Sequence, residues 1–160
     1  MSRETTYQGG CLCGAVRYRT TASPINERVC HCRLCQKAIG ASFNARLLFR
    51  ADEVTVEGAV DYVHTSADLK RGFCARCGTT LFSRRLSNDT IGPTAGSLDD
   101  PSLFKPQMHI YVASKQPWLV IDDGLPQYDG MPPACYATSG GRTVRFHLAV
   151  TLNSLEKPNP

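Results

Sequence analysis

The chain has no apolar run of membrane length, and its polar start, Met1 to Thr6, lacks the pattern of a secretory signal. We therefore expect a protein that does not associate with a membrane. Because many reduced cysteines without a signal are typical of a reducing compartment, we also expect a cytoplasmic location. Internal repeats and a dividing linker are missing too, and 160 residues are enough for one hydrophobic core. The sequence predicts a single domain over residues 1–160.

Concentrated basic charge is missing as well. The formal net charge of +4 counts cysteine as neutral, and ionised cysteines would lower it. The basic residues are scattered, with only short pairs such as Lys70-Arg71 and Arg84-Arg85, which we interpret as solvated faces. Nucleic acid is therefore not an expected partner.

Cysteine, in contrast, is abundant and clustered. Seven of the eight cysteines form three groups, Cys11-x-Cys13, Cys30-x-Cys32-x-x-Cys35 and Cys74-x-x-Cys77. A closed tetrahedral zinc site takes four cysteines, and the other three would hold a metal whose fourth position stays open to water or substrate. The count therefore predicts two Zn²⁺ ions per chain, one structural and one catalytic.

The neighbours of the cysteines indicate how they are grouped. Gly14 follows the first pair and Gly78 the last, and glycine suits the left-handed or crowded turn after a metal-binding knuckle. Two facing knuckles would complete a four-cysteine site of the zinc-ribbon kind, while the central group has three sulfurs within six residues. Iron also fits an all-sulfur site, and disulfides or inert thiols are further alternatives, although cysteines one residue apart bridge poorly. We interpret the isolated Cys135 as an ordinary small residue.

Strand signals outnumber helix signals, which predicts an all-β, loop-rich fold. The one helical stretch, 34–39, follows the central cysteines. We interpret Gly92-Pro93, Asp100-Pro101 and Met131 to Pro133 as loop residues in the second half of the chain. Short β-branched, aromatic or alternating runs predict strands at 15–20, 43–49, 54–57, 60–65, 79–83, 109–112 and 143–152.

Strand length also predicts where the central cysteines lie. Between Cys13 and Cys30 the chain can run out along one strand, turn near Ser23-Pro24 and return over residues 27–29. At ~3.3 Å per residue this excursion is on the order of 20 Å and folds back on itself. We therefore expect Cys30 near Cys11 and Cys13, with the two metals as neighbours within one domain.

Six segments form a wider pattern: GGCLCGAVRY at 9–18, CHCRLCQK at 30–37, GFCARCGT at 72–79, GSLDDP at 96–101, HIYVASKQPW at 109–118 and DGLPQY at 123–128. Together they resemble the family of glutathione-dependent formaldehyde-activating enzymes. The resemblance covers about residues 8–130, and three spaced cysteine motifs are more specific than any one of them. A C-terminal extension, about 135–152, falls outside it.

The resemblance implies the β-tent fold of the family. It also implies carbon–sulfur lyase activity, in which glutathione and formaldehyde combine to S-hydroxymethylglutathione or the adduct is cleaved. The zinc ligands that it implies fall into two sets, a structural one of Cys11, Cys13, Cys74 and Cys77, and a catalytic one of Cys30, Cys32 and Cys35.

The three-cysteine site suits this chemistry. A thiol bound at the open position would lose its proton, because the cation stabilises thiolate. Attack of the thiolate on a small aldehyde gives a hemithioacetal without a redox step or an organic cofactor. Three thiolates make zinc a weak Lewis acid, so positioning of the reactants should matter more, and it can contribute roughly 7–11 kcal/mol.

Candidates for substrate contacts are Ser97, Lys115 and Trp118. Ser97 could offer hydroxyl and N–H donors, although a simple Gly-Ser turn is the alternative. Lys115 and Trp118 could meet the carboxylates and the apolar stem of glutathione, but a surface lysine and a core tryptophan are equally plausible. For three other polar residues we expect structural or solvent-facing roles: His31, His109 and Arg33.

The alternative function is a non-catalytic, zinc-organised binding module of the β-tent fold. A third class, an iron electron-transfer protein, would be dismissed by a colourless preparation. Fold alone cannot choose between the first two. The sequence leaves open which thiol and which aldehyde react, and whether the chain forms a homo-oligomer.

Overall fold

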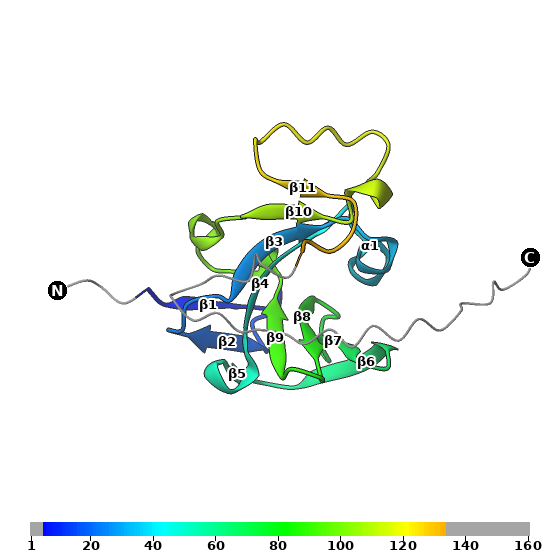
Figure 1. The fold of residues 1–160 in the computed structure, drawn as a ribbon. Helices are drawn as coiled ribbons and strands as arrows, with labels where there is room; N and C mark the ends of the chain where they lie inside the picture. Colours follow the sequence, from blue (N-terminus) through cyan, green and yellow to red (C-terminus); the bar gives the residue numbers. More distant parts are fainter. Residues whose placement is uncertain (1–4, 134–160) are drawn as a thin grey trace, which may run out of the picture.

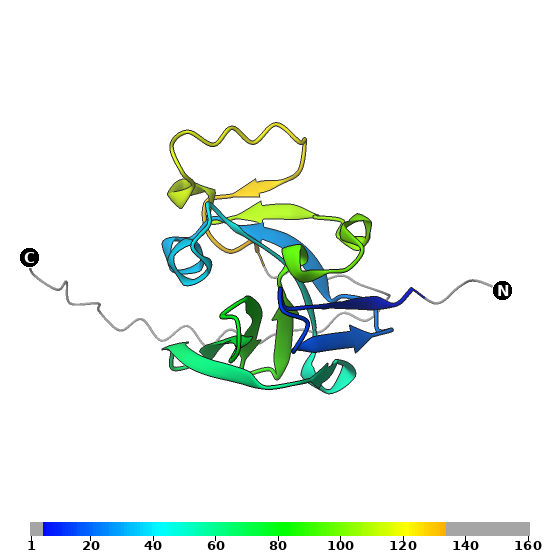
Figure 2. The same cartoon turned by 180° about the vertical axis from the view of Figure 1, so that it is seen from behind.

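The computed structural model describes residues 5–133, which form two β-sheets and one short α-helix (Figure 1; from behind in Figure 2). The smaller sheet contains β1 (Tyr7–Gly10), β2 (Arg17–Thr20) and β5 (Thr55–Glu57). Its strand order is β1-β2-β5, and both pairs are antiparallel. The predicted all-β class is confirmed.

The larger sheet contains β3 (Asn26–Cys30), β4 (Asn44–Arg50), β6 (Val60–Ser66), β7 (Leu69–Cys74), β8 (Thr80–Arg85), β9 (Thr90–Pro93), β10 (Met108–Ile110) and β11 (Gln127–Tyr128). The strand order is β11-β10-β3-β4-β9-β8-β7-β6. β10 runs parallel to β3 and β11, and the other pairs are antiparallel. In Figure 1, β4 connects the upper strands β3, β10 and β11 with β9 below them.

Helix α1 (Arg33–Ile39) follows β3 almost directly and agrees with the predicted helix. Cys32 caps its N-terminus by accepting a hydrogen bond from the backbone N–H of Cys35, and Gly40 ends it in the left-handed conformation. Short 3₁₀ turns lie in the connections at Ala51–Glu53, Ala95–Ser97, Pro101–Leu103 and Val112–Ser114. Among residues 5–133, no helix is long and apolar enough to cross a membrane.

The main hydrophobic core joins the smaller sheet to the middle of the larger one. Tyr18 of β2 packs edge-on against Phe82 of β8, with ring centroids 5.5 Å apart. Around this pair lie the buried side chains of Val16, Leu47, Phe49, Leu81, Ile91 and Leu98. This packing fixes the loop between β1 and β2 relative to the loop between β7 and β8, and both loops carry cysteines.

A smaller apolar cluster lies between α1 and the strands β3 and β10. It consists of Cys30, Cys35, Met108 and Ile110, with further apolar side chains at its edge. Two of the predicted metal ligands therefore lie in a packed environment with little freedom to move.

The predicted strands agree with the structure to within two residues at each end wherever the chain is described. The interpretation of Gly92-Pro93 as loop residues is wrong, because both residues are buried in β9 and pair with β8. Pro93 lies beyond the residues of β9 that pair with β4, so the strand is paired on one side only there, as at a sheet edge where proline is tolerated. The predicted strand 143–152 and Cys135 lie outside the described residues.

Leu81→Ala should lower the free energy of unfolding by about 2–5 kcal/mol, because the Leu81 side chain is fully buried in the main core. Leu86→Ala makes the same change where the residue is 45% exposed, and it should shift the free energy by no more than about 0.5 kcal/mol. Urea unfolding of the metal-loaded protein measures both values. Equal losses would contradict the position of this core between the two sheets.

Candidate functional site

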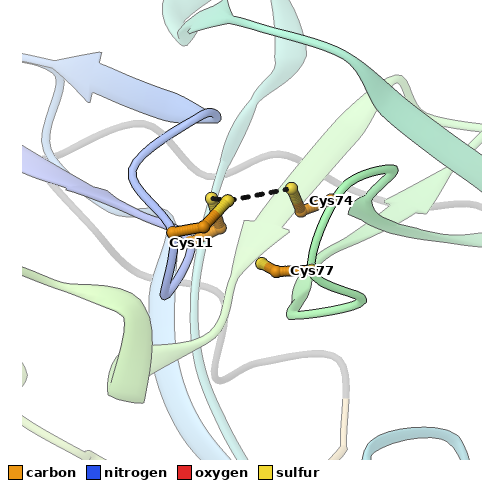
Figure 3. Close-up of side chains that lie close together, drawn as sticks. Cys11, Cys74 and Cys77 are labelled. Atoms are coloured by element: carbon orange, nitrogen blue, oxygen red, sulfur yellow. Dashed lines mark hydrogen bonds between the residues drawn. The ribbon is translucent and has the colours of Figure 1, made fainter.

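Four cysteine sulfurs from two distant segments meet at the edge of the main core. Cys11 and Cys13 lie in the loop after β1, Cys74 ends β7 and Cys77 follows it. All four Sγ atoms lie within 4.8 Å of one another, with 3.5 Å between Cys11 and Cys13 and 3.8 Å between Cys13 and Cys74. Figure 3 shows Cys11 on one loop facing Cys74 and Cys77 on the other. The structure thus brings together the four cysteines predicted to form one site.

Each of these loops is a knuckle closed by a glycine. Gly14 and Gly78 have φ angles of 75° and 73°, the left-handed conformation predicted for them. Their N–H groups donate to the carbonyl oxygens of Cys11 and Cys74, at 3.1 and 2.9 Å. The glycines therefore turn the chain back over the preceding sulfur.

Backbone and hydroxyl donors surround the sulfurs of the knuckles. The N–H of Val16 donates to Cys11 Sγ at 3.2 Å. Thr79 Oγ1 lies 3.2 Å from Cys77 Sγ, and hydrogen bonds from the Thr79 side chain and backbone lower the pKa of Cys77 to about 5. These donors thus stabilise negative charge on Cys11 and Cys77, whereas the pKa of Cys13 is raised to about 11.

The other three candidate ligands come from one segment. Cys30 ends β3, Cys32 caps α1 and Cys35 lies in its first turn. Their Sγ atoms also lie within 4.8 Å of one another, and the N–H of Cys35 donates to Cys32 Sγ at 3.3 Å. The N-terminal cap of α1 therefore holds the sulfurs of Cys32 and Cys35 beside the sulfur of Cys30.

Arg71 of β7 brings positive charge to this cluster, because its Nη2 donates to Cys35 Sγ at 3.2 Å. Hydrogen bonds from Cys30 and Cys32, assisted by Arg71, hold the pKa of Cys35 far below its usual value. The same sulfur–sulfur contacts, together with burial, raise the pKa of Cys30. One thiol can therefore ionise easily, but full ionisation of all three needs a cation.

The sulfur geometry fits a zinc ion. Tetrahedral zinc with Zn–S bonds of about 2.3 Å places its ligand sulfurs roughly 3.8 Å apart. The Cys13–Cys74 distance of 3.8 Å has this value, and the Cys11–Cys13 distance of 3.5 Å is slightly shorter. Thiolate sets favour zinc or iron over metals that prefer oxygen ligands. Both clusters could therefore bind a metal ion and are consistent with zinc.

Strand β7 connects the two clusters. Arg71 contacts Cys35 of the three-cysteine cluster, and Cys74, three residues further along, belongs to the four-cysteine cluster. At ~3.3 Å per residue, these two positions are about 10 Å apart along the strand. This connection supports the expectation that the two metal sites are neighbours.

A cavity of about 790 Å³ opens beside the four-cysteine cluster. Cys11, Leu12 and Thr79 line one part of it, and Phe43 and Asn44 line another. Asn44 is the cross-strand partner of Cys30. The cavity thus extends from one cluster to the strand beside the other, and its volume is typical of a small-molecule site.

The three residues predicted to contact substrate do not line one hollow. Ser97 lines the large cavity, and its hydroxyl donates to the Thr94 carbonyl oxygen at 2.8 Å. Trp118 lines a smaller hollow of about 350 Å³ beside α1 and is 68% exposed, so it is not a core residue. Lys115 lines neither hollow, and its Nζ donates to the Leu119 carbonyl oxygen at 2.8 Å. Of the three, only Ser97 lines the large cavity, and its hydroxyl also lies 2.9 Å from the Tyr18 hydroxyl.

A chain of hydrogen bonds holds the histidine between Cys30 and Cys32. His31 Nε2 lies 2.8 Å from His109 Nδ1, and His109 Nε2 lies 2.7 Å from Asp123 Oδ2. Burial lowers the pKa of His31, and the hydrogen bond from His109 lowers the pKa of Asp123. These hydrogen bonds hold the His31 ring toward β10, in line with the structural roles expected for both histidines.

Several polar residues around the three-cysteine cluster were not expected from the sequence: Arg28, Asn44, Arg46 and Arg71. The interpretation of Lys70-Arg71 as part of a solvated face is wrong for Arg71, which is only 4% exposed. Arginine and asparagine are ordinarily exposed, so nothing in their type marks these positions as buried. The one available signal is the place of Arg28 two residues before Cys30, on the same face of a strand.

A family model described as "Glutathione-dependent formaldehyde-activating enzyme" matches residues 6–114 of the chain. An uncharacterized lyase of Schizosaccharomyces pombe is 30% identical to it over 76 residues, which are 48% of this chain and 56% of the yeast protein. The match therefore spans little more than half the length of this curated relative. The crystal structure of a Rhodobacter sphaeroides protein is similar with a TM-score of 0.49 and 20% identity, over 76% of this chain and 98% of the other.

The metal-loaded protein should contain two zinc ions per chain, and mild chelation should remove one of them first. The three-cysteine cluster offers one protein ligand fewer than the four-cysteine cluster, so its metal should be the weaker bound. Metal quantitation during titration with a weak chelator measures both steps. A single metal per chain, or two released together, would contradict this division.

Cys77→Ser should give insoluble or molten protein, because structural zinc sites contribute roughly 10–16 kcal/mol that is inseparable from folding. Cys32→Ser should stay folded and lose only the second metal, because Cys32 belongs to the other cluster. Near-ultraviolet circular dichroism and metal content of the two variants test this difference. Two variants that fold equally well would show that the ligands are divided wrongly.

Proposed function

Because the chain belongs to the family of glutathione-dependent formaldehyde-activating enzymes, we propose that it is a zinc-dependent carbon–sulfur lyase. Its substrates are a small thiol, such as glutathione, and a small aldehyde, such as formaldehyde, which combine to S-hydroxymethylglutathione or are released from it. The name of the fission-yeast relative, a lyase, supports this reaction class. All cysteines in the described part of the chain are free thiols, which suits the proposed cytoplasmic location.

The three-cysteine cluster is the observation that carries this proposal. Its sulfurs come from one short segment and face one another, so they can hold a metal without help from the other cluster. A set of three protein ligands is typical of catalytic zinc, whereas a set of four is typical of structural zinc. A protein that needed zinc only for folding would have no need of the second set.

Each residue of the cluster has a role that follows from its contacts. When bound to Cys30, Cys32 and Cys35, zinc supplies an open position that favours the thiolate form of a substrate thiol. The N–H of Cys35 orients Cys32, and the guanidinium of Arg71 stabilises negative charge on Cys35 through its hydrogen bond. Burial of Cys30 and Cys35 keeps water away from two of the sulfurs.

The reaction is an addition without a redox change. The sulfur electron pair forms a bond to the aldehyde carbon, the carbonyl π pair moves to oxygen, and that oxygen takes up a proton. Cleavage reverses these movements and breaks the carbon–sulfur bond. The chain contributes mainly by holding both reactants beside the three-cysteine cluster. The large cavity adjoins this site through Asn44, which lines the cavity and lies opposite Cys30.

Glutathione should bind the cobalt-substituted protein with its sulfur as a new ligand and increase the sulfur-to-cobalt charge-transfer absorption. Binding should release a proton near neutral pH, because metal coordination requires thiolate. Formaldehyde added to this complex should form the adduct faster than in buffer. Absorption spectra, proton release in weak buffer and adduct formation followed by NMR measure the three effects.

Matched cysteine variants provide the control. Cys32→Ser should abolish the rate gain and the spectral change, since it removes a candidate ligand. Cys135→Ser makes the same substitution outside the three cysteine groups and should leave both intact. If glutathione leaves the cobalt spectrum unchanged or does not bind, thiol activation fails and the binding-module alternative is favoured.

A further inference from the structure

A row of arginines crosses the larger sheet beside the three-cysteine cluster. Arg28 on β3 lies directly opposite Arg46 on β4. Arg46 reaches across β9, and its Nη1 donates to Ser83 Oγ on β8 at 2.9 Å. Ser83 in turn pairs with Arg71 on β7. Like charges opposite each other destabilise a sheet, so the Arg28–Arg46 pair needs a compensating negative charge, and Arg71 adds a third positive charge to the same row.

Gly92 of β9 makes room for the row. A Cβ at this position would lie 2.7 Å from Ser83 Oγ and 3.4 Å from Arg46 Nη1. Any side chain here would therefore press on the hydrogen bond between Arg46 and Ser83. The strand lacks a side chain where the guanidinium of Arg46 passes over it.

The guanidinium groups are withdrawn from water but incompletely paired. Arg28 is 8% exposed, Arg71 is 4% exposed and Arg46 is half-buried. The Nε atom of each is buried without a hydrogen-bond partner among residues 5–133. Burial, together with the charge of Arg28, lowers the pKa of Arg46 to about 10. Buried donors without partners are costly, which indicates that an acceptor belongs at this position.

No carboxylate of the described chain forms an ion pair with the row. Glu27, the one buried acidic residue there, neighbours Arg28 on β3 and so points to the opposite face, where it accepts from the N–H of Lys105 at 2.8 Å. The ion pairs found in residues 5–133 involve other cations: Arg17, Arg50, Arg84, Arg85 and His109. The sulfurs are the negative groups nearest to the row: Cys35 Sγ accepts from Arg71 Nη2 at 3.2 Å, and Cys30 lies two residues from Arg28 on the same face of β3.

The charge balance of the metal-loaded cluster leaves an excess of positive charge. Three thiolates and three guanidinium groups cancel, and a divalent cation then adds two positive charges. A substrate thiolate compensates one of these, so about one remains beside the reacting sulfur. A second negative group on the same substrate would compensate it.

We propose that Arg28, Arg46 and Arg71 form an anion subsite that binds a carboxylate of the thiol substrate. This inference rests on the proposed function and narrows its substrate to thiols that carry a carboxylate. Arg28 is two residues from Cys30 on one face of β3, about 7 Å along the strand. That spacing suits a thiol whose carboxylate lies within about 7 Å of its sulfur.

Asn44 marks the path from the cavity to this subsite. It lines the cavity, lies opposite Cys30 and has a buried Oδ1 without a hydrogen-bond partner in the described chain. Arg46 follows two residues later on the same face of β4. Asn44 therefore joins the lining of the cavity to the face of the sheet that carries the sulfurs and the guanidinium groups.

The test compares two thiols of equal length on the full, cobalt-substituted chain: 3-mercaptopropionate, which has a carboxylate, and 3-mercapto-1-propanol, which has none. Dissociation constants are measured from the charge-transfer bands. The protein should bind the carboxylate thiol about 10- to 100-fold more tightly, since charge-assisted hydrogen bonds contribute about this much. Arg46→Gln should remove most of this preference.

Arg50→Gln is the matched control, because it makes the same charge change on the same strand at an exposed residue paired with Asp52. It should keep the preference. Equal binding of the two thiols by the unmodified protein would overturn the subsite and leave the proposed function standing. If neither thiol changed the cobalt spectrum, the proposed function itself would fail, and the subsite with it.

Inorganic phosphate distinguishes a substrate subsite from general anion binding. Phosphate that weakens binding of 3-mercaptopropionate but not of the alcohol supports the subsite. Phosphate competition that persists in Arg46→Gln would place the anion elsewhere and overturn it. If Arg46→Gln does not fold, Arg46→Lys keeps the charge but loses the planar fork, and an unchanged preference in that variant would also overturn the proposal.

Discussion

Negative charge on closely spaced sulfurs is the constraint on which the rest of this structure depends. Seven cysteines are gathered into two groups in which the sulfurs lie within 4.8 Å of one another. Charges at this distance repel strongly unless donors or cations compensate them. The knuckle N–H groups, the Thr79 hydroxyl and the Arg71 guanidinium all point at sulfur and supply part of that compensation. A metal ion at each group would supply the rest.

The same constraint ties the fold together. Cys13 and Cys74 are 61 residues apart in the sequence, yet their sulfurs are 3.8 Å apart. In the main core, Tyr18 of one sheet packs against Phe82 of the other. This contact holds in place the two cysteine-bearing loops, β1–β2 and β7–β8. Core packing and sulfur ligation therefore act on the same pair of loops, and each limits the freedom that the other would have to overcome.

Spacing and periodicity predicted the parts of the chain whose local pattern decides their structure. The helix after Cys32 and the turns at Gly14 and Gly78 depend on neighbouring residues alone, and they are present. The sequence did not predict β7 and β9 as strands, because contacts with neighbouring strands determine which residues fit there. Arg71 is buried against Cys35, and Gly92 lies beside the Arg46–Ser83 hydrogen bond. Such cross-strand contacts leave no periodic trace in one sequence.

The proposed division into structural and catalytic cysteines would not separate folding from chemistry. β7 carries Arg71, which touches the three-cysteine cluster, and Cys74, which belongs to the other one. Metal binding at the four-cysteine cluster would fix the end of the strand that presents Arg71 to the three-cysteine cluster. Because a charged hydrogen bond depends steeply on distance and angle, the first cluster would then position Arg71 as well as link the two sheets.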